Sequence, residues 1–145
     1  MIPALIDIGG SLSVLPPGVH DATLDEIEQR FAVSDHRKEL FSGLKKGIDN
    51  LRQAGCKIVF LNGSFVTDKA VPNDYDACWD HQGVIIAKLD PVFLVFEKKR
   101  EKQKKSYYGE YFPAFALADG VINFYEYFQF DKYTGKAKGI IKINL

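Results

Sequence analysis

The sequence has no excess of charge of either sign, because its 19 lysines and arginines balance 19 aspartates and glutamates over 145 residues. A neutral chain argues against a protein that holds nucleic acid by bulk electrostatic attraction. The chain also lacks a long apolar run, and its 46% hydrophobic and 26% charged residues are typical of globular proteins. Neither disorder nor a membrane span is expected, and the length predicts one domain over residues 1–145.

Cysteine is scarce as well, with only Cys56 and Cys78. Two cysteines make no disulfide framework, and neither belongs to a Cys-x-x-Cys pair, so we expect buried free thiols in a reducing compartment. The three histidines lack the spacing of zinc ligands, which argues against a zinc site. The first residues are apolar but contain no basic segment typical of a signal peptide. The sequence thus predicts a cytoplasmic protein.

The most informative pattern present is Gly63-Ser64, followed after nine residues by Asp74 and Asp76. Residues 57–61, just before it, form a short apolar run rich in β-branched side chains, which predicts a buried strand. Gly63 ends that strand where the backbone must turn or approach another group closely, and Ser64 offers a hydroxyl beside exposed N–H groups. If the two aspartates begin a second strand, their side chains lie on the same side of it.

Two carboxylates on one side are the ligands that a hard cation such as Mg²⁺ or Mn²⁺ prefers, with phosphates and waters completing the coordination. An alternative is a β-hairpin whose loop, residues 67–74, is rich in ordinary turn formers. In that case Asp74 caps the turn, and Asp76 is a solvated residue at the edge of a sheet. Both interpretations remain open at this point.

An apolar strand, Gly-Ser, about ten residues and Asp-x-Asp together resemble the signature of the DNA polymerase beta-like nucleotidyltransferases. The resemblance covers roughly residues 40–130. It implies an α/β (α+β) fold, with a mixed β-sheet and helices packed on one face. More loosely, the chain is similar to short bacterial nucleotidyltransferase-like proteins that are often discussed with toxin–antitoxin and phage-defence loci. The pieces that carry this looser similarity are residues 15–20, 63–69, 78–80, 111–114 and 128–140.

The resemblance implies a site that uses an NTP together with Mg²⁺ or Mn²⁺. Asp74 and Asp76 would be the metal ligands, while Gly63 and Ser64 would hold the nucleotide phosphates. Lys69 lies in the intervening segment. It either neutralises phosphate charge or is a solvated loop lysine.

The family normally has a third carboxylate on a later strand, where it activates the acceptor hydroxyl. Glu110 precedes a predicted strand and is the first candidate. Glu126 is the second, although its aromatic neighbours would bury an unpaired carboxylate at a cost in free energy. Without a third acid, the site would bind a nucleotide without transferring it.

The coarse order of elements is a helix pair, two strands around the motif, a third helix and further strands. Helices are expected over residues 24–30, 35–54 and 91–107, since each follows a typical N-cap or capping box. Strands are expected over residues 57–61, 75–79, 111–117, 121–130 and 139–144, the last as a hairpin strand after a turn at 134–136. Residues 1–20 are expected to be an extended lead-in, because they are rich in glycine and proline.

These features predict transfer of a nucleoside monophosphate from an NTP to a hydroxyl group of a protein or RNA. The alternative is a catalytically weak nucleotidyltransferase-like module, an antitoxin or sensor, that binds a partner protein or RNA. Six lysines and arginines within residues 98–105 form either the solvated end of a helix or a surface for RNA. Aromatic residues within 107–133 are candidates for an oligomer or partner surface. Trp79 either stacks on a base or lies in the core.

Overall fold

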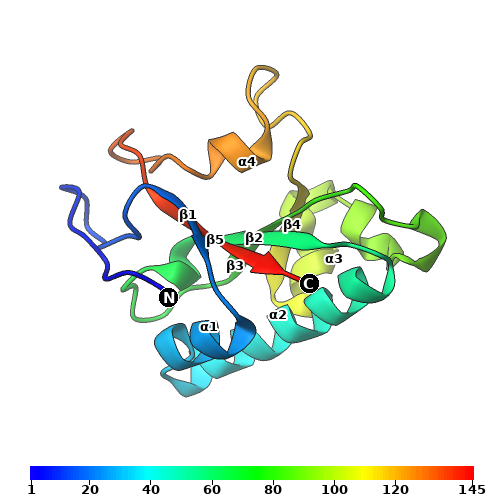
Figure 1. Ribbon diagram of the computed structural model, residues 1–145, viewed down its shortest axis with the longest axis horizontal. Coiled ribbons are helices and arrows are strands. Elements are labelled where there is room, and N and C mark those ends of the chain that lie inside the picture. The colour runs from blue at the N-terminus through cyan, green and yellow to red at the C-terminus, as the bar shows by residue number, and fades with distance from the viewer.

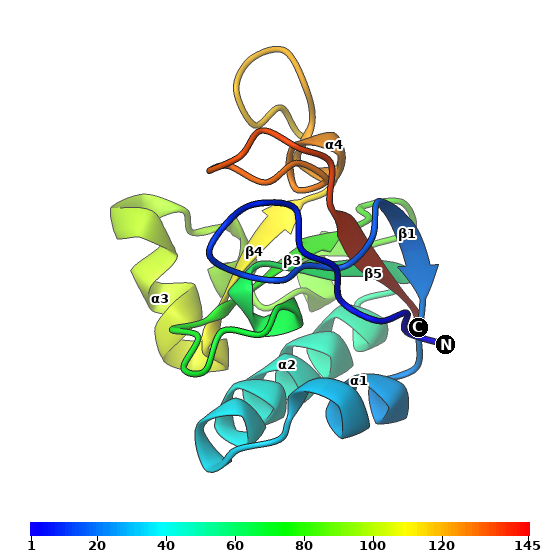
Figure 2. The same ribbon diagram turned by 90° about the vertical axis from the view of Figure 1, so that its left-hand side faces the viewer.

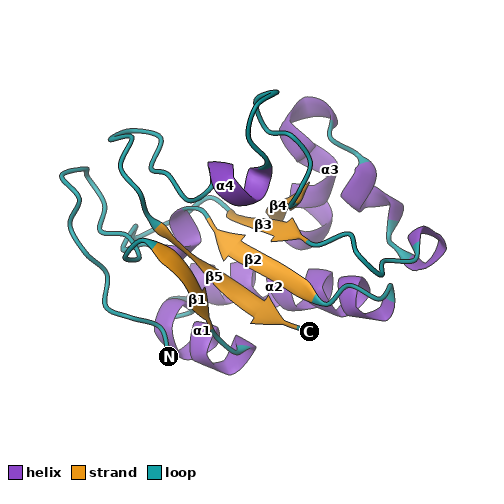
Figure 3. Cartoon of the chain, turned by 45° about the horizontal axis from the view of Figure 1, so that its top comes forward, coloured by secondary structure: helices purple, strands orange, loops and turns teal.

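A computed structural model describes the whole chain, residues 1–145. At its centre is a five-stranded sheet in the order β1-β5-β2-β3-β4 (Figure 3). The strands are β1 (Gly18–Asp21), β2 (Ile58–Asn62), β3 (Tyr75–Trp79), β4 (Gly109–Pro113) and β5 (Gly139–Asn144). The pairs β1–β5 and β3–β4 are parallel, whereas β2 is antiparallel to both of its neighbours. The predicted mixed α/β architecture is thereby confirmed.

Four α-helices accompany the sheet: α1 (Leu24–Phe31), α2 (Asp35–Gln53), α3 (Glu97–Tyr107) and α4 (Phe124–Tyr127). α1 and α2 lie against one face, and α3 runs beside the edge strand β4 (Figure 1). The short α4 lies over the opposite face, which departs from the expectation that the helices pack on one face. None of the helices has the length and apolar character needed to cross a bilayer.

α1 and α2 begin where their sequences predict. The Thr23 hydroxyl accepts the N–H of Glu26, whose carboxylate in turn accepts the N–H of Thr23, so α1 opens with a capping box. The Ser34 hydroxyl caps α2 by accepting the N–H of Arg37. After α2, the positive φ of 97° at Gly55 lets the chain leave the helix and enter β2.

The two faces of the sheet have different environments, because successive side chains of a strand point to opposite faces. Towards α2, Val59, Leu61 and Ala77 pack against a buried helical stripe in the main core. That stripe consists of Leu40, Leu44, Ile48 and Leu51. On the other face a smaller cluster, which includes Phe60, Cys78 and Phe112, packs against residues of α4. Polar residues of β3 and β4 on this second face are therefore covered by far fewer side chains than those on the face towards α2.

The helix predicted over residues 91–107 is wrong in its first half. Pro91–Leu94 makes only a 3₁₀ turn, and α3 begins at Glu97. Phe93 is fully buried and stacks on Tyr107, with 5.0 Å between ring centroids, so burial of this ring in the core overrides helix continuity. Residues 98–100 have φ between 50° and 59°, so the regular right-handed turns of α3 lie beyond them.

The strand predictions need three corrections. Residues 121–130 contain α4 instead of a strand, because the Asn123 side chain caps a helical turn by accepting the N–H of Glu126. The strand predicted over 111–117 starts earlier and ends at Pro113, as β4. β5 forms as predicted but pairs with β1 and β2 rather than in a hairpin. β1 itself lies partly within the expected lead-in, and its partner is about 120 residues away in the chain.

Arg37 of α2 fixes the course of the loop between β2 and β3. Its side chain is buried, and its guanidinium donates to the backbone carbonyls of Phe65 at 2.8 Å, Thr67 at 3.0 Å and Lys69 at 2.6 Å. A further bond reaches the carbonyl of Phe31 at the end of α1. One side chain thus supplies donors to a loop whose carbonyls have no strand partner.

Arg37→Met is expected to lower the free energy of unfolding by about 3 kcal/mol, because buried carbonyls lose their donors while the apolar stem is kept. Urea denaturation measures this loss. Arg52→Met is the matched control, since Arg52 pairs only with Asp49 on the surface and its loss costs less than about 1 kcal/mol. Equal destabilisation by the two substitutions would contradict the role given to Arg37.

Candidate active site

A cleft of about 900 Å³ opens on the sheet face opposite α1 and α2. Its floor is formed by the turn after β2 and by the beginnings of β3 and β4. One wall is the N-terminal loop around residues 10–14, and the other is the segment of residues 118–138 that includes α4 (Figure 2). The two walls are joined, because the Lys136 ammonium donates to the carbonyl of Ile8 at 2.9 Å.

Three carboxylates converge on the floor of this cleft. Asp76 of β3 lies beside Glu110 of the parallel strand β4, and Asp74 lies two residues before Asp76 on the same side. One carboxylate oxygen from each residue lies within 4.8 Å of the other two. We name this group, Asp74, Asp76 and Glu110, the acid cluster. Its members come from neighbouring strands, so the register of the sheet sets their separation.

Gly63 is required where β2 turns towards the acid cluster. Its φ is 85°, a conformation that residues with a side chain rarely adopt. A Cβ atom at this position would lie 2.6 Å from a carboxylate oxygen of Asp76, which is closer than real contacts allow. The backbone therefore passes directly beside Asp76. This close approach is the physical reason for glycine at this point of the motif.

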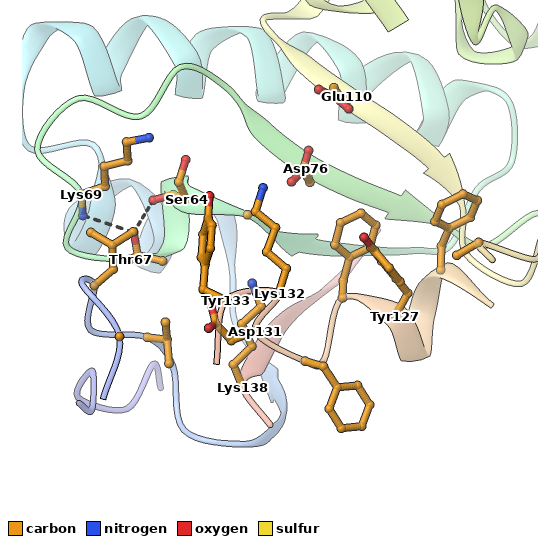
Figure 4. A pocket seen from close by; sticks show the side chains of 18 of the residues that line it. Ser64, Thr67, Lys69, Asp76, Glu110, Tyr127, Asp131, Lys132, Tyr133 and Lys138 are labelled. Atoms are coloured by element: carbon orange, nitrogen blue, oxygen red, sulfur yellow. Dashed lines mark hydrogen bonds between the residues drawn. The ribbon is translucent and has the colours of Figure 1, made fainter. Parts of the chain in front are cut away.

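The turn after Gly63 is held by short-range hydrogen bonds. Ser64–Val66 forms a 3₁₀ turn, and the Thr67 hydroxyl donates to the carbonyl of Ser64 at 2.6 Å. The same hydroxyl accepts the N–H of Lys69, so the loop folds back beside the cleft. Ser64, Thr67 and Lys69 line it (Figure 4). The Ser64 hydroxyl and the Lys69 ammonium therefore face the same space as the acid cluster.

The acid cluster carries more negative charge than its surroundings neutralise. Burial raises the pKa of Asp76 to about 8, and the nearby carboxylates of Glu110 and Asp74 add to the shift. Burial and the charge of Glu110 also raise the pKa of Asp74. The nearest cation is Lys104 of α3, whose ammonium lies 3.0 Å from Glu110 and 3.8 Å from Asp74. One ammonium among three carboxylates leaves an excess that a bound cation would offset.

Three further lysines line the cleft: Lys69, Lys132 and Lys138. None of them makes an ion pair with a carboxylate in the structure. Burial lowers the pKa of Lys138, while the charges of Asp131 and Asp76 oppose that shift. These ammonium groups are available to an anionic ligand in the cleft.

The structure brings most of the residues singled out in the sequence into one place. Gly63, Ser64 and Lys69 all lie against the cleft that holds the acid cluster. Glu110, the first candidate for a third carboxylate, belongs to the cluster, whereas Glu126 is exposed on α4 and does not. The β-hairpin alternative is right about the antiparallel pairing of β2 and β3, but Asp76 is half-buried rather than solvated.

The exposure of individual side chains decides two further expectations, on Trp79 and on the basic run of residues 98–105. Trp79 is 2% exposed in the main core, so it is not placed to stack on a ligand. The cations of the basic run, residues 98–105, lie in different environments. Arg100 packs on Phe112, with 3.9 Å between the guanidinium carbon and the ring centroid, and Lys104 reaches the acid cluster, while the other lysines are exposed.

Lys104, Lys138 and Tyr133 were not expected at the site from the sequence. Lys104 belongs to a run that is typical of a solvated helix end. Lys138 lies in the loosely similar residues 128–140 and Tyr133 in the aromatic stretch 107–133, and neither pattern indicates a position beside the acids. A signal was present only for Lys104. It lies in the last turn of α3, six residues before Glu110, but nothing local predicts the direction in which α3 packs.

The acid cluster suits a hard divalent cation. Its donors are all carboxylate oxygens, which Mg²⁺ and Mn²⁺ prefer to nitrogen or sulfur. None of the ion pairs in the structure involves the Asp76 carboxylate, so its oxygens are not already committed to a cation. Asp74, Asp76 and Glu110 are the residues that would hold such an ion.

Asp76→Asn is expected to stabilise the metal-free protein, and the gain should grow with pH. The folded protein keeps a proton on Asp76 up to about pH 8, whereas the ordinary pKa is 3.8. Between these values the wild type loses stability as the pH rises, because the unfolded state ionises at Asp76 while the folded state still holds its proton. We expect the gain to increase by about 2 kcal/mol across this window, measured by urea denaturation with EDTA.

Asp119→Asn is the matched control for that experiment. Asp119 also lines the cleft, but backbone N–H groups of Ile122 and Val121 lower its pKa. Its carboxylate therefore stabilises the folded state above the ordinary pKa, and its loss should be unfavourable at neutral pH. A pH-independent effect of Asp76→Asn would contradict the buried charge assigned to Asp76.

Comparisons with known proteins place the chain in a family. Residues 9–144 match a family described as "Family of unknown function (DUF6932)". Neither the curated proteins nor the solved structures gave a match. Because the match spans everything except residues 1–8 and Leu145, the chain belongs to the DUF6932 family.

Proposed function

We propose that this protein is a metal-dependent nucleotidyltransferase with a minimal polymerase beta-like fold. It transfers a nucleoside monophosphate from an NTP to a hydroxyl group, using Mg²⁺ or Mn²⁺. The observation that carries the proposal is the position of Glu110, which completes a group of three carboxylates with Asp74 and Asp76 beside the Gly63 turn. The sequence motif contains two of the acids, and nucleotidyl transfer in the resembled family requires a third.

The arrangement of the sheet is consistent with that fold. β2 leads through Gly63 into a loop, β3 carries the paired aspartates, and β4 adds the third acid from the neighbouring parallel position. α2 supports this unit from behind, through its buried stripe and through the hydrogen bonds of Arg37. The acids therefore lie on a rigid sheet rather than on a mobile loop, as precise positioning of reacting groups demands.

The chain's own residues provide two halves of a phosphate-transfer site. Asp74 and Asp76 would hold the metal, which when bound neutralises charge on the triphosphate. The Gly63–Ser64 turn offers backbone N–H groups and a hydroxyl to the phosphates, and Lys69 adds a positive charge beside it. Ser64, Lys69 and Asp76 all line the same cleft (Figure 4).

Glu110 is placed to act on the acceptor. In transfer, the acceptor oxygen bonds to the α-phosphorus, the bond to pyrophosphate breaks, and the acceptor's proton must leave. A carboxylate oxygen of Glu110 accepts that proton in our proposal. The Lys104 ammonium, 3.0 Å away, pairs with the Glu110 carboxylate before a substrate binds.

A second candidate function is a binding module of the antitoxin or sensor kind that does not transfer nucleotides. One observation favours it: Lys104 already contacts both Asp74 and Glu110, so an internal cation partly neutralises the acid cluster without a metal. In such a protein the cleft would hold a nucleotide or a partner, and the acids would serve structure alone. The two candidates differ in whether a metal binds.

Radiolabelled NTPs test the first candidate. With Mg²⁺ or Mn²⁺ and a mixture of protein and RNA acceptors, label incorporation should fall at least about 100-fold in Asp74→Asn, Asp76→Asn and Glu110→Gln. Glu126→Gln is the matched control, because this carboxylate is exposed on α4 and outside the acid cluster, and it should leave incorporation unchanged. Equal incorporation in all five proteins would sink the assignment.

Lys104→Met separates the two candidates by a binding measurement. Removing a cation next to the acid cluster should tighten Mn²⁺ binding about tenfold by calorimetry, since the ammonium repels the ion. Lys105→Met, at an exposed position outside the cleft, should bind Mn²⁺ like the wild type. If none of the three proteins binds Mn²⁺, the binding module is the better description.

A further inference from the structure

We propose that the cleft binds a single-stranded nucleic acid whose bases stack on Tyr127 and Tyr133, and that the end of this strand is the acceptor. The role of the strand's end rests on the proposed transfer function, whereas the binding surface does not. The surface consists of Tyr127, Phe130, Lys132, Tyr133 and Lys138, which we name the aromatic wall. All five residues line the cleft.

The aromatic wall contains rings that remain largely exposed to solvent. Tyr127 is 42% exposed, Phe130 52% and Tyr133 79%, although each lines a cleft beside charged groups. Their neighbours Phe124 and Phe128 behave differently, since both pack on Phe112 of β4. Within one short segment, inner rings anchor the wall to the sheet and outer rings remain exposed, with Tyr127 in edge contact with Phe124 and Phe128. Exposed rings gathered in one cleft mark a ligand surface.

The outer rings share one cleft with the acid cluster and with the proposed phosphate turn. Tyr127, Tyr133 and Ser64 all line it (Figure 4). Tyr127 contacts Phe128, which packs on Phe112, two residues beyond Glu110 in β4. Through these ring contacts Tyr127 is connected to the strand that carries Glu110. A strand stacked on the two rings would lie in the cleft that holds Glu110.

Cations accompany the rings. The Lys132 ammonium lies 5.0 Å from the centroid of the Tyr133 ring, and neither Lys132 nor Lys138 pairs with a carboxylate. A hydrogen-bonded turn presents this pair, because Asp131 accepts the N–H of Thr134 with its side chain and the N–H of Gly135 with its carbonyl. Rings for bases beside cations for phosphates are the combination that binds single strands without sequence preference.

The floor of the cleft does not suit an extended peptide. A peptide acceptor would typically add to a free strand edge through backbone hydrogen bonds. At β4 the backbone of Tyr111 is already engaged by α3, since its N–H donates to Gln103 and its carbonyl accepts from Arg100. The exposed lysines of α3 lie outside this cleft, away from the aromatic wall. We therefore place the nucleic acid in the cleft and not on the basic run of α3.

The charge of the lining predicts how binding depends on metal. Five carboxyl groups and three lysines line the cleft, and Lys104 adds a fourth ammonium at the acid cluster, so the fully ionised lining has one negative charge in excess without a cation. The carboxylates are those of Asp74, Asp76, Glu110, Asp119 and Asp131. Divalent cations on the acid cluster would offset this excess and admit a strand. Binding should therefore weaken when EDTA removes the metal.

Fluorescence anisotropy tests the proposal with a labelled single strand of about 12 nucleotides and the matching duplex, in Mg²⁺ and without NTP. The single strand should bind the wild type more tightly than the duplex does. Tyr127→Leu combined with Tyr133→Leu should weaken it at least about tenfold, because leucine keeps apolar area but cannot stack. Phe115→Leu is the matched control, since this ring is also exposed but lies outside the cleft, and it should not change the affinity.

Lys132→Gln provides an independent readout on the same wall. It should reduce the slope of log affinity against log salt by about 0.7, as expected for one lost phosphate contact. Thermal melts confirm that each variant is folded. Equal binding of duplex and single strand, or wild-type affinity in the double tyrosine variant, would overturn the proposal.

The strand-binding experiment and the label-transfer experiment can fail independently of each other. If the strand binds as described but no label is transferred, the binding surface stands and the transfer function fails. If label enters protein while no strand binds, the transfer function stands and the nucleic-acid acceptor is overturned.

Discussion

Mutual repulsion among three half-buried carboxylates is the constraint on which the rest of this structure depends. Asp74, Asp76 and Glu110 would separate if they stood on flexible segments, because burial weakens their solvation and each opposes the charge of the others. The sheet prevents this, since β3 and β4 are hydrogen-bonded neighbours with Asp76 in register with Glu110. Burial and the neighbouring carboxylates of Glu110 and Asp74 together raise the pKa of Asp76 to about 8. Sites that hold like charges together trade stability for chemistry.

The support for the acid cluster comes from the face of the sheet that the cleft does not use. Glycines at positions 43 and 47 let α2 lie close to α3 and β4. A Cβ atom at these positions would collide with the Tyr107 carbonyl or the Tyr111 hydroxyl. The Tyr111 hydroxyl in turn bonds that of Tyr75, which flanks the acids on the core side of β3. Each acid therefore alternates along its strand with a fully buried ring. Tight packing on one face fixes the geometry on the other.

α3 and the segment of residues 118–138 connect this rigid centre to its ligands. α3 brings Lys104 to the acids and passes Arg100 over Phe112, so a helix that looks like a solvated basic element contributes to the site from the edge of the sheet. The later segment has little regular structure and is anchored by Phe124, Tyr125 and Phe128 against the sheet and by the hydrogen bond from Lys136 to Ile8. It carries the exposed rings and lysines of the aromatic wall. A rigid floor with a thinly anchored wall is a common division between positioning and recognition.

The local sequence determined the strand–turn–strand unit with Gly63, Ser64, Asp74 and Asp76, as well as the caps of α1 and α2. These follow from side-chain periodicity, backbone preferences and contacts within about four residues, all of which a sequence displays directly. Glu110 was only one of two candidates, because its choice over Glu126 depends on the parallel pairing of β3 with β4. The tertiary structure alone decided that pairing, the inclusion of β1, the break before α3 and the approach of Lys104. Each depends on burial between segments distant in the chain, such as Phe93 against Tyr107, and such packing overrides local propensity.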